Sequence, residues 1–207
     1  MEQRFNRILV VLSRLAGRQL SVDEEVYQAE LKSADRNMGL GYMLRAAGTI
    51  VCDPAEAVRG YIRQCSIKVS VRDLAVMASV LCNSGVHPRT GETIMPSEIV
   101  RQVLSVMATC GMYDGSCEWL EKIGFSAKSG VAGGVMGALS GKVGNPTYSS
   151  NLDDCGNSVR SIHICKQLST DLGLHIMDLS RFMSSPLRTT AAKRARLSNF
   201  LEQCSVL

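Results

Sequence analysis

The segment that most restricts the fold of this chain spans residues 124–148, with the sequence GFSAKSGVAGGVMGALSGKVGNPTY. It is rich in glycine and valine, and turn signals such as SGKVGNP divide it, which predicts two or three short strands. The connections between these strands are too short for crossovers, so the strands must pair antiparallel. Because so small a sheet is thin for a chain of 207 residues, we expect part of the sheet to lie outside this chain.

The remainder of the sequence favours helices, beginning with apolar residues at helical spacing over residues 3–16. Cap signals predict where further helices begin and end: a Ser21–Glu24 capping box, Asp53 before Pro54, Ser70, Ser97 and a final Gly173. We therefore expect helices over residues 22–30, 33–48, 71–85, 97–110, 156–173 and 190–203, and a further helix that opens at Asp53 and Pro54 and contains Tyr61. Helices grouped before and after a small antiparallel sheet indicate an α+β fold rather than alternating βαβ units.

The net charge of +4 arises within the basic C-terminal tail, residues 178–207, because the residues from Arg181 onward carry five basic groups and one acid. Residues 1–180 are neutral overall, so no nucleic-acid-binding surface is expected. No apolar run reaches the length of a bilayer span, and the first residues lack the apolar core of a signal peptide. We expect a cytoplasmic protein that does not contact membranes, with a basic tail that is solvated or touches an acidic partner.

The eight cysteines are scattered without a C-x-x-C pair or a matching histidine spacing. This pattern argues against a metal site, and no cofactor is indicated. We interpret the cysteines as free thiols, with Cys65, Cys82 and Cys110 as fillers of the core. His87, in a turn before Pro88, is expected to face solvent, and His163 to be a packed or surface residue rather than a ligand.

One lysine interrupts the predicted strands, in the tripeptide Lys128-Ser129-Gly130. This matches the K-[ST]-G element of serine acyl-transfer enzymes, where a lysine on an edge strand stabilises developing negative charge. Glycines inside a strand mark places where a ligand or another backbone comes close, so Gly130, Gly133 and Gly134 are expected to give access to the strand. The alternative is an exposed lysine at a strand end, which three residues alone do not exclude.

Longer blocks of the sequence resemble the serine-dependent glutaminases, a family with a fold like that of β-lactamases and penicillin-binding proteins. The blocks are LSVDEEVYQAELKSADRNMGLGYMLRAAGTI, YIRQCSIKVSVRDLAVMASVLCNSGVHPRTGE, CGMYDGSCEWLEKIGFSAKSGVAGGV and GNSVRSIHICKQLSTDLGLHIMD. The resemblance implies that residues 1–177 form the C-terminal major part of a glutaminase domain. It also implies hydrolysis of L-glutamine to L-glutamate and ammonia through a seryl acyl-enzyme, in a dimer or tetramer.

The same resemblance implies the site residues: Tyr113 and Lys128 as catalytic groups, and Glu30, Asn37, Tyr61, Tyr113 and Val131 as substrate-binding groups. The chemistry suits these roles, since a carboxylate binds the substrate ammonium and an amide both donates and accepts hydrogen bonds. Each residue also has a purely structural alternative. Glu30 suits a solvated ion pair, Asn37 a helix cap, and the two tyrosines the edge of a core.

The chain departs from the family at the nucleophile, because none of its seven lysines lies three residues after a serine, as the S-x-x-K element requires. We expect the family's N-terminal part of the fold to be missing from this sequence, and we expect the chain alone not to turn over glutamine efficiently. The alternative is a catalytically inactive, glutaminase-like module that binds an amino acid or serves in assembly.

Overall fold

A computed structural model describes residues 2–178 of the chain, and the predicted tail helix over residues 190–203 lies outside them. Its elements, in chain order, are α1 (Glu2–Ala16), α2 (Glu24–Lys32), α3 (Asp35–Ala46), α4 (Pro54–Cys65), α5 (Val71–Cys82), α6 (Ser97–Cys110), a 3₁₀ turn η1 (Tyr113–Gly115), α7 (Ser116–Lys122), β1 (Ser126–Ser129), β2 (Gly134–Leu139), β3 (Val143–Tyr148) and α8 (Val159–Leu172). The predicted α+β fold is confirmed, with α7 as a helix that the sequence patterns did not reveal.

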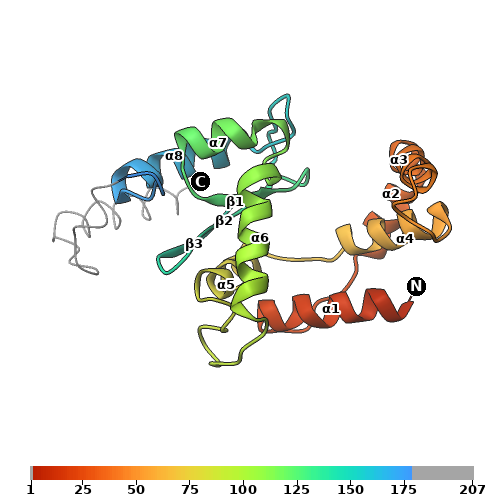
Figure 1. The fold of residues 1–207 in the computed structure, drawn as a ribbon, viewed down its shortest axis with the longest axis horizontal. Coiled ribbons are helices and arrows are strands. Elements are labelled where there is room, and N and C mark those ends of the chain that lie inside the picture. Colours follow the sequence, from red (N-terminus) through yellow and green to blue (C-terminus); the bar gives the residue numbers. More distant parts are fainter. Residues whose placement is uncertain (1, 179–207) are drawn as a thin grey trace.

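The three strands form one antiparallel sheet in the order β1-β2-β3, which leaves β1 as an edge strand (Figure 1). Successive residues of β2 face opposite sides of this sheet. Val135 and Leu139 pack into a cluster with residues of α7 and α8, whereas Ala138 packs with residues of α5 and α6. The sheet is therefore the middle layer of three, and the fold around it holds β1 at an accessible edge.

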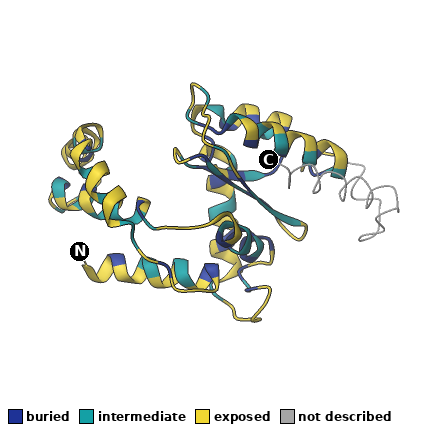
Figure 2. Ribbon diagram, turned by 180° about the vertical axis from the view of Figure 1, so that it is seen from behind, coloured by how far each residue is buried: buried dark blue, intermediate teal, exposed yellow. Residues whose placement is uncertain are grey.

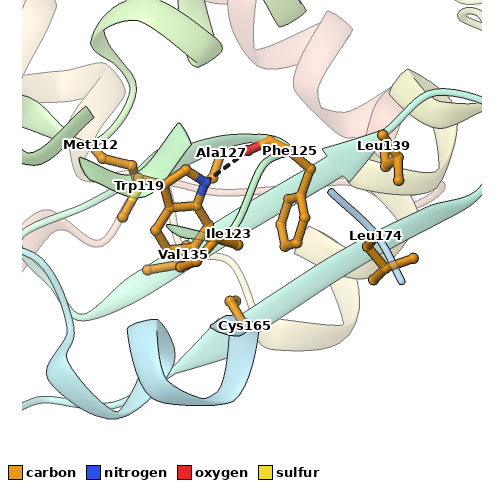
Figure 3. Close-up of a cluster of buried hydrophobic side chains, with 9 residues drawn as sticks. All are labelled: Met112, Trp119, Ile123, Phe125, Ala127, Val135, Leu139, Cys165 and Leu174. Carbon is orange, nitrogen blue, oxygen red and sulfur yellow. Dashed lines mark hydrogen bonds between the residues drawn. The ribbon is translucent and has the colours of Figure 1, made fainter. Parts of the chain in front are cut away.

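The core between the sheet and the pair α7 and α8 centres on Trp119 and Phe125, whose rings meet edge to face at 5.7 Å (Figure 3). The indole Nε1 of Trp119 donates a 2.7 Å hydrogen bond to the carbonyl of Phe125, so this aromatic residue is buried with its polar group satisfied. Cys165 of α8 completes the cluster, and burial raises the pKa of its thiol to about 12.

Helices α2, α3 and α4 form an arm at the end of the molecule that includes the N-terminus, away from the sheet (Figure 1). The core of this arm is small, with Ala34, Val58 and Ile62 as its buried apolar residues. Many arm residues are exposed, as the yellow ribbon of Figure 2 shows, including the large side chains of Tyr42 and Met43 on α3. The C-terminal end of α4 lies on the side of the arm that faces the sheet (Figure 1).

Most predicted helix boundaries are confirmed by local capping. Asp53 caps α4 at the Glu56 N–H with Pro54 in the first turn, and Ser70 forms a capping box with Asp73. Gly173 ends α8 in the left-handed conformation, with φ of 62°.

Two cap predictions were wrong. Asp23, not Ser21, caps α2, because Val22 pairs with Ile67 in an extended bridge and Lys68 holds the Asp23 carboxylate at 2.8 Å. Helix α6 begins at Ser97 itself, after Pro96, and without a side-chain cap.

Two of the three predictions about core cysteines were also wrong. Cys82 is buried as expected, but Cys65 and Cys110 are exposed, because each lies beside an exposed residue one turn earlier on its helix, Tyr61 and Val106.

His87 is buried rather than solvent-facing. Its Nδ1 accepts hydrogen bonds from the backbone N–H groups of Arg89 and Thr90, both at 3.3 Å, so the ring closes its own turn. His163 is exposed on α8, which agrees with the expected surface residue.

Candidate active site

The candidate site is built around Lys128 on the edge strand β1. Its neighbours Ala127 and Ser129 point into the core, so strand alternation directs the Lys128 side chain outward. Its Nζ donates to the carbonyl of Ser129 and lies 4.4 Å from the ring centroid of Tyr113, a cation–π contact. Partial burial lowers the pKa of the Lys128 ammonium, so this charge is less hydrated than an ordinary surface lysine.

Tyr113 reaches Lys128 from the turn between α6 and α7. Its backbone has φ of 52°, in the left-handed region that bulky residues rarely adopt. The ring borders Val131 and the 149–158 loop: a Cβ added at Gly156 would lie 3.8 Å from Cε2 of Tyr113 and 4.0 Å from Cγ1 of Val131. Tyr113 and Val131 therefore share one small surface with Lys128.

Val131 lies in the hairpin between β1 and β2 and is 69% exposed. Within residues 2–178 its backbone N–H donates to no protein acceptor, so it is available to a ligand. Gly133, with φ of 97°, lies against the backbone of another segment. A Cβ there would lie 2.3 Å from the carbonyl of Ser149, so this glycine permits close backbone packing.

Two residues of the arm lie within electrostatic range of this surface. The pKa of Tyr61 is raised, first by a hydrogen bond with Cys65 one turn further along α4, then by burial and by the charges of Tyr113 and Glu30. Glu30 is exposed on α2, and Tyr61 is 55% exposed. Contacts thus bring together Tyr113, Lys128 and Val131, whereas Tyr61 and Glu30 are linked to them only through electrostatic effects on the pKa of Tyr61.

In the described part of the chain, no hydrogen bond or ion pair joins Asn37 to the other site residues, and the same is true of Glu30. Asn37 is half-buried in the first turn of α3.

Residues that the sequence reasoning did not select also belong to the surroundings of the site. The thiols of Cys65 and Cys110 act electrostatically on Lys128, and both are exposed. The hydroxyl of Ser129, the middle residue of the K-S-G element, is buried without a hydrogen-bond partner in the described part of the chain. Cys65 and Cys110 are the last residues of α4 and α6, beside the site. The sequence pattern of these helices gave no sign that they lie near Lys128.

A cavity of about 500 Å³ lies elsewhere, between α1 and the 86–92 turn, and contains none of the predicted site residues. Its principal charged groups are already paired, since Arg14 bonds Glu92 and Arg18 bonds Asp73. Residues 2–178 contain no group of three or more His, Cys, Asp or Glu side chains placed to hold a metal ion. No helix in the same range is long and apolar enough to cross a membrane.

Comparison with known proteins gives one family. The sequence model described as Glutaminase matches residues 1–177. A glutaminase of Corynebacterium glutamicum is 45% identical over 189 residues, covering 91% of this chain and 46% of the relative. Glutaminase 1 of Bradyrhizobium diazoefficiens is 45% identical over 178 residues, covering 86% of this chain and 29% of the relative.

Solved structures agree with the sequence relatives. The native form of Mglu has a TM-score of 0.84 at 48% identity, covering 87% of this chain and 44% of that one. A probable glutaminase of Bacillus subtilis has a TM-score of 0.81 at 27% identity, covering 84% of this chain and 59% of that one. These neighbours have the β-lactamase-like fold that the family resemblance implied. The chain spans less than half the length of the first curated relatives, and it belongs to the glutaminase family.

Proposed function

We propose that this chain contributes the amino-acid pocket and the K-S-G strand of a glutaminase that hydrolyses L-glutamine to L-glutamate and ammonia. The observation that carries the proposal is the proximity of Lys128, the Tyr113 ring at 4.4 Å and the Val131 N–H, which has no acceptor among residues 2–178. Glu30 and Tyr113 lie within electrostatic range of Tyr61. In this proposal residues 1–177 are the C-terminal major part of the catalytic domain, and residues 178–207 are a separate basic tail.

The reaction uses a serine hydroxyl that attacks the side-chain amide carbon of glutamine. The C–N bond breaks, and the leaving amide nitrogen takes up the proton that the serine hydroxyl gave up, so that it departs as ammonia. Water then hydrolyses the acyl-enzyme to glutamate and free serine. In this scheme the Val131 N–H donates to the oxygen of the reacting carbonyl, and Tyr113 carries the proton between serine and leaving group. The charge of Lys128 stabilises the negative charge that develops beside it.

The head group of the substrate is assigned to the arm. The Glu30 carboxylate accepts charge-assisted hydrogen bonds from the α-ammonium group, and Tyr61 and Asn37 complete the contacts. The exposure of Glu30 supports this assignment, because it pairs with no cation in the described part of the chain. The proposal also includes a homodimer or tetramer, which the family resemblance implies. It places the protein in the cytoplasm, which the free thiols of the described cysteines support.

A second candidate is an inactive module that binds an amino acid, and the absence of S-x-x-K from the 207 residues favours it. Both candidates require binding, so the first test is calorimetric titration of the chain with L-glutamate. We expect Glu30→Gln to weaken binding by roughly tenfold to a hundredfold, the range for a charge-assisted hydrogen bond. Glu25→Gln, the same change on an exposed position of α2, is the matched control and should leave the affinity unchanged.

Equal effects of the two variants, or no binding by the unaltered chain, would contradict the assigned pocket. A measurement of glutamine hydrolysis then distinguishes the glutaminase from the inactive binding module. We expect no glutamate release by the 207 residues alone, and release at an ordinary enzymatic rate would show that a nucleophile lies within them. A longer product of the same gene that carries S-x-x-K and hydrolyses glutamine would favour the enzyme over the binding module.

A further inference from the structure

The backbone of Tyr113 is held in an unfavourable conformation. A φ of 52° at a bulky residue costs roughly 1–2 kcal/mol relative to the ordinary helical or extended regions. Such a conformation persists only where the surroundings determine it, and an observed outlier at a candidate site is a reason to ask what fixes it. Hydrogen bonds made by neighbouring residues hold Tyr113 in this conformation.

Ser116 fixes the turn from its C-terminal side. Its Oγ accepts a 3.0 Å hydrogen bond from the Met112 N–H and donates a 2.7 Å bond to the Tyr113 carbonyl. The hydroxyl thus bonds to the peptide group that precedes Met112 and to the peptide group that follows Tyr113. Ser116 is only 4% exposed, so water does not readily replace these bonds if the hydroxyl is removed.

Asn157 fixes the same turn from a different part of the chain. Its Nδ2 donates a 3.0 Å hydrogen bond to the Met112 carbonyl, and its own N–H donates to Asp153 at 2.8 Å. Asn157 is 2% exposed, and a Cβ added at Gly115 would lie only 3.3 Å from its amide nitrogen. The 149–158 loop is therefore locked against the turn that carries Tyr113.

A third contact joins the turn to the strand of Lys128. The N–H of Ser129 donates a 2.9 Å hydrogen bond to the Gly111 carbonyl. Because Lys128 precedes Ser129 on β1, this bond fixes the distance between the strand and the start of the turn. Once the strand is anchored, the φ of Tyr113 decides whether its ring covers the Lys128 ammonium.

We propose that Ser116 and Asn157 are positioning residues that hold the strained turn, and with it the Tyr113 ring over Lys128. The consequence for chemistry rests on the proposed glutaminase function, in which Tyr113 transfers a proton. Neither side chain is placed to contact the substrate. They act on Tyr113 through the Met112 and Tyr113 peptide groups, and without them the turn relaxes and the ring moves away from the lysine.

The test observes the pair of side chains directly. In the chain labelled with ¹³C at the lysine ε-carbon, the ring of Tyr113 shifts the ε-proton resonance of Lys128 upfield. Lys128→Arg assigns this resonance, and Tyr113→Leu gives its position without the ring. We expect Ser116→Ala to move the resonance most of the way to the Tyr113→Leu position.

Ser169→Ala is the matched control, since Ser169 is also 4% exposed and donates a 2.5 Å hydrogen bond to the carbonyl of Ile123, remote from the turn. It should cost similar stability and leave the Lys128 resonance in place. Asn157→Asp, which keeps the side-chain shape but removes the donor, is the second variant and should shift the resonance as Ser116→Ala does.

The proposal is overturned if the resonance stays in place in folded Ser116→Ala or folded Asn157→Asp, or if Ser169→Ala moves it equally. This readout does not depend on turnover. If the unaltered chain binds no glutamate while Ser116→Ala still moves the resonance, the proposed function fails and the positioning role stands.

Discussion

The hydrogen-bond network around Asp73 is a sensitive test of how the fold is held together. Its buried carboxylate accepts 2.7 and 2.6 Å bonds from Nε and Nη2 of Arg18, and two 2.7 Å bonds from the N–H and Oγ of Ser70. These four bonds join the segment after α1 to the start of α5, the helix that packs on β2 and β3. The perturbation is Asp73→Asn, which keeps the side-chain shape and removes the charge.

The expected loss of stability follows from the donors that remain. An asparagine has one acceptor oxygen, so its NH₂ group must face either the guanidinium or the Ser70 donors. Losing charge-assisted bonds costs roughly 1.5–3 kcal/mol, and losing the cap costs about 0.5–2 kcal/mol. Because the bonds share one carboxylate, the two losses are not additive. We expect Asp73→Asn to lower the free energy of unfolding by roughly 3 kcal/mol, because the Asp73 side chain is only 6% exposed, although that of its partner Arg18 is 50% exposed.

Urea denaturation at pH 7 measures this loss, with Glu92→Gln as the control. Glu92 also pairs with an arginine of the N-terminal region, Arg14 at 2.6 Å, but the two side chains are 50% and 41% exposed. An exposed pair of this kind contributes less than about 1 kcal/mol. Equal losses in the two variants would refute the reasoning that burial, and not the ion pair as such, makes Asp73 important.

The pH dependence gives an independent measure. Hydrogen bonding by Arg18 holds the pKa of the Asp73 carboxyl well below its usual range. A carboxyl whose pKa is lower in the folded state stabilises the fold above its unfolded pKa of about 3.9, and this contribution is lost as pH falls toward the folded value. The difference in the free energy of unfolding between the unaltered chain and Asp73→Asn should therefore be constant from neutral pH to about pH 5. It should shrink below about pH 4.

Two further predictions concern close packing and thiol reactivity. Gly111→Ala should destabilise the chain by roughly 3 kcal/mol or more, because the new Cβ would lie 1.8 Å from the Ala127 carbonyl oxygen. Gly39→Ala, in open space within α3, should instead stabilise it by about 0.5–1 kcal/mol, and a comparison of urea midpoints checks both. Iodoacetamide on the folded chain should leave Cys165 unmodified, because burial raises its pKa to about 12, and mass spectrometry should find alkylation at the exposed thiols Cys65, Cys110, Cys117 and Cys155. Early modification of Cys165 would show that the α8 side of the core opens.

The sequence by itself determined the elements whose signals are local. The Asp53–Pro54 start, the Ser70 cap and the Gly173 end each depend on bonds within four residues, so they are visible in a short window of sequence. Short connections likewise required an antiparallel sheet, and the K-S-G element fell on its edge strand as expected.

Only the tertiary structure decided which side chains meet. Asn157 bonds the carbonyl of Met112 from 45 positions away, and no local preference of either residue encodes that contact. His87 looked like a turn residue in water, yet its Nδ1 satisfies two backbone donors and its ring is buried. The same holds for the placement of Tyr113 over Lys128. Backbone propensities act over a few residues, whereas burial and side-chain pairing depend on how distant segments pack, and that packing is what creates the candidate site.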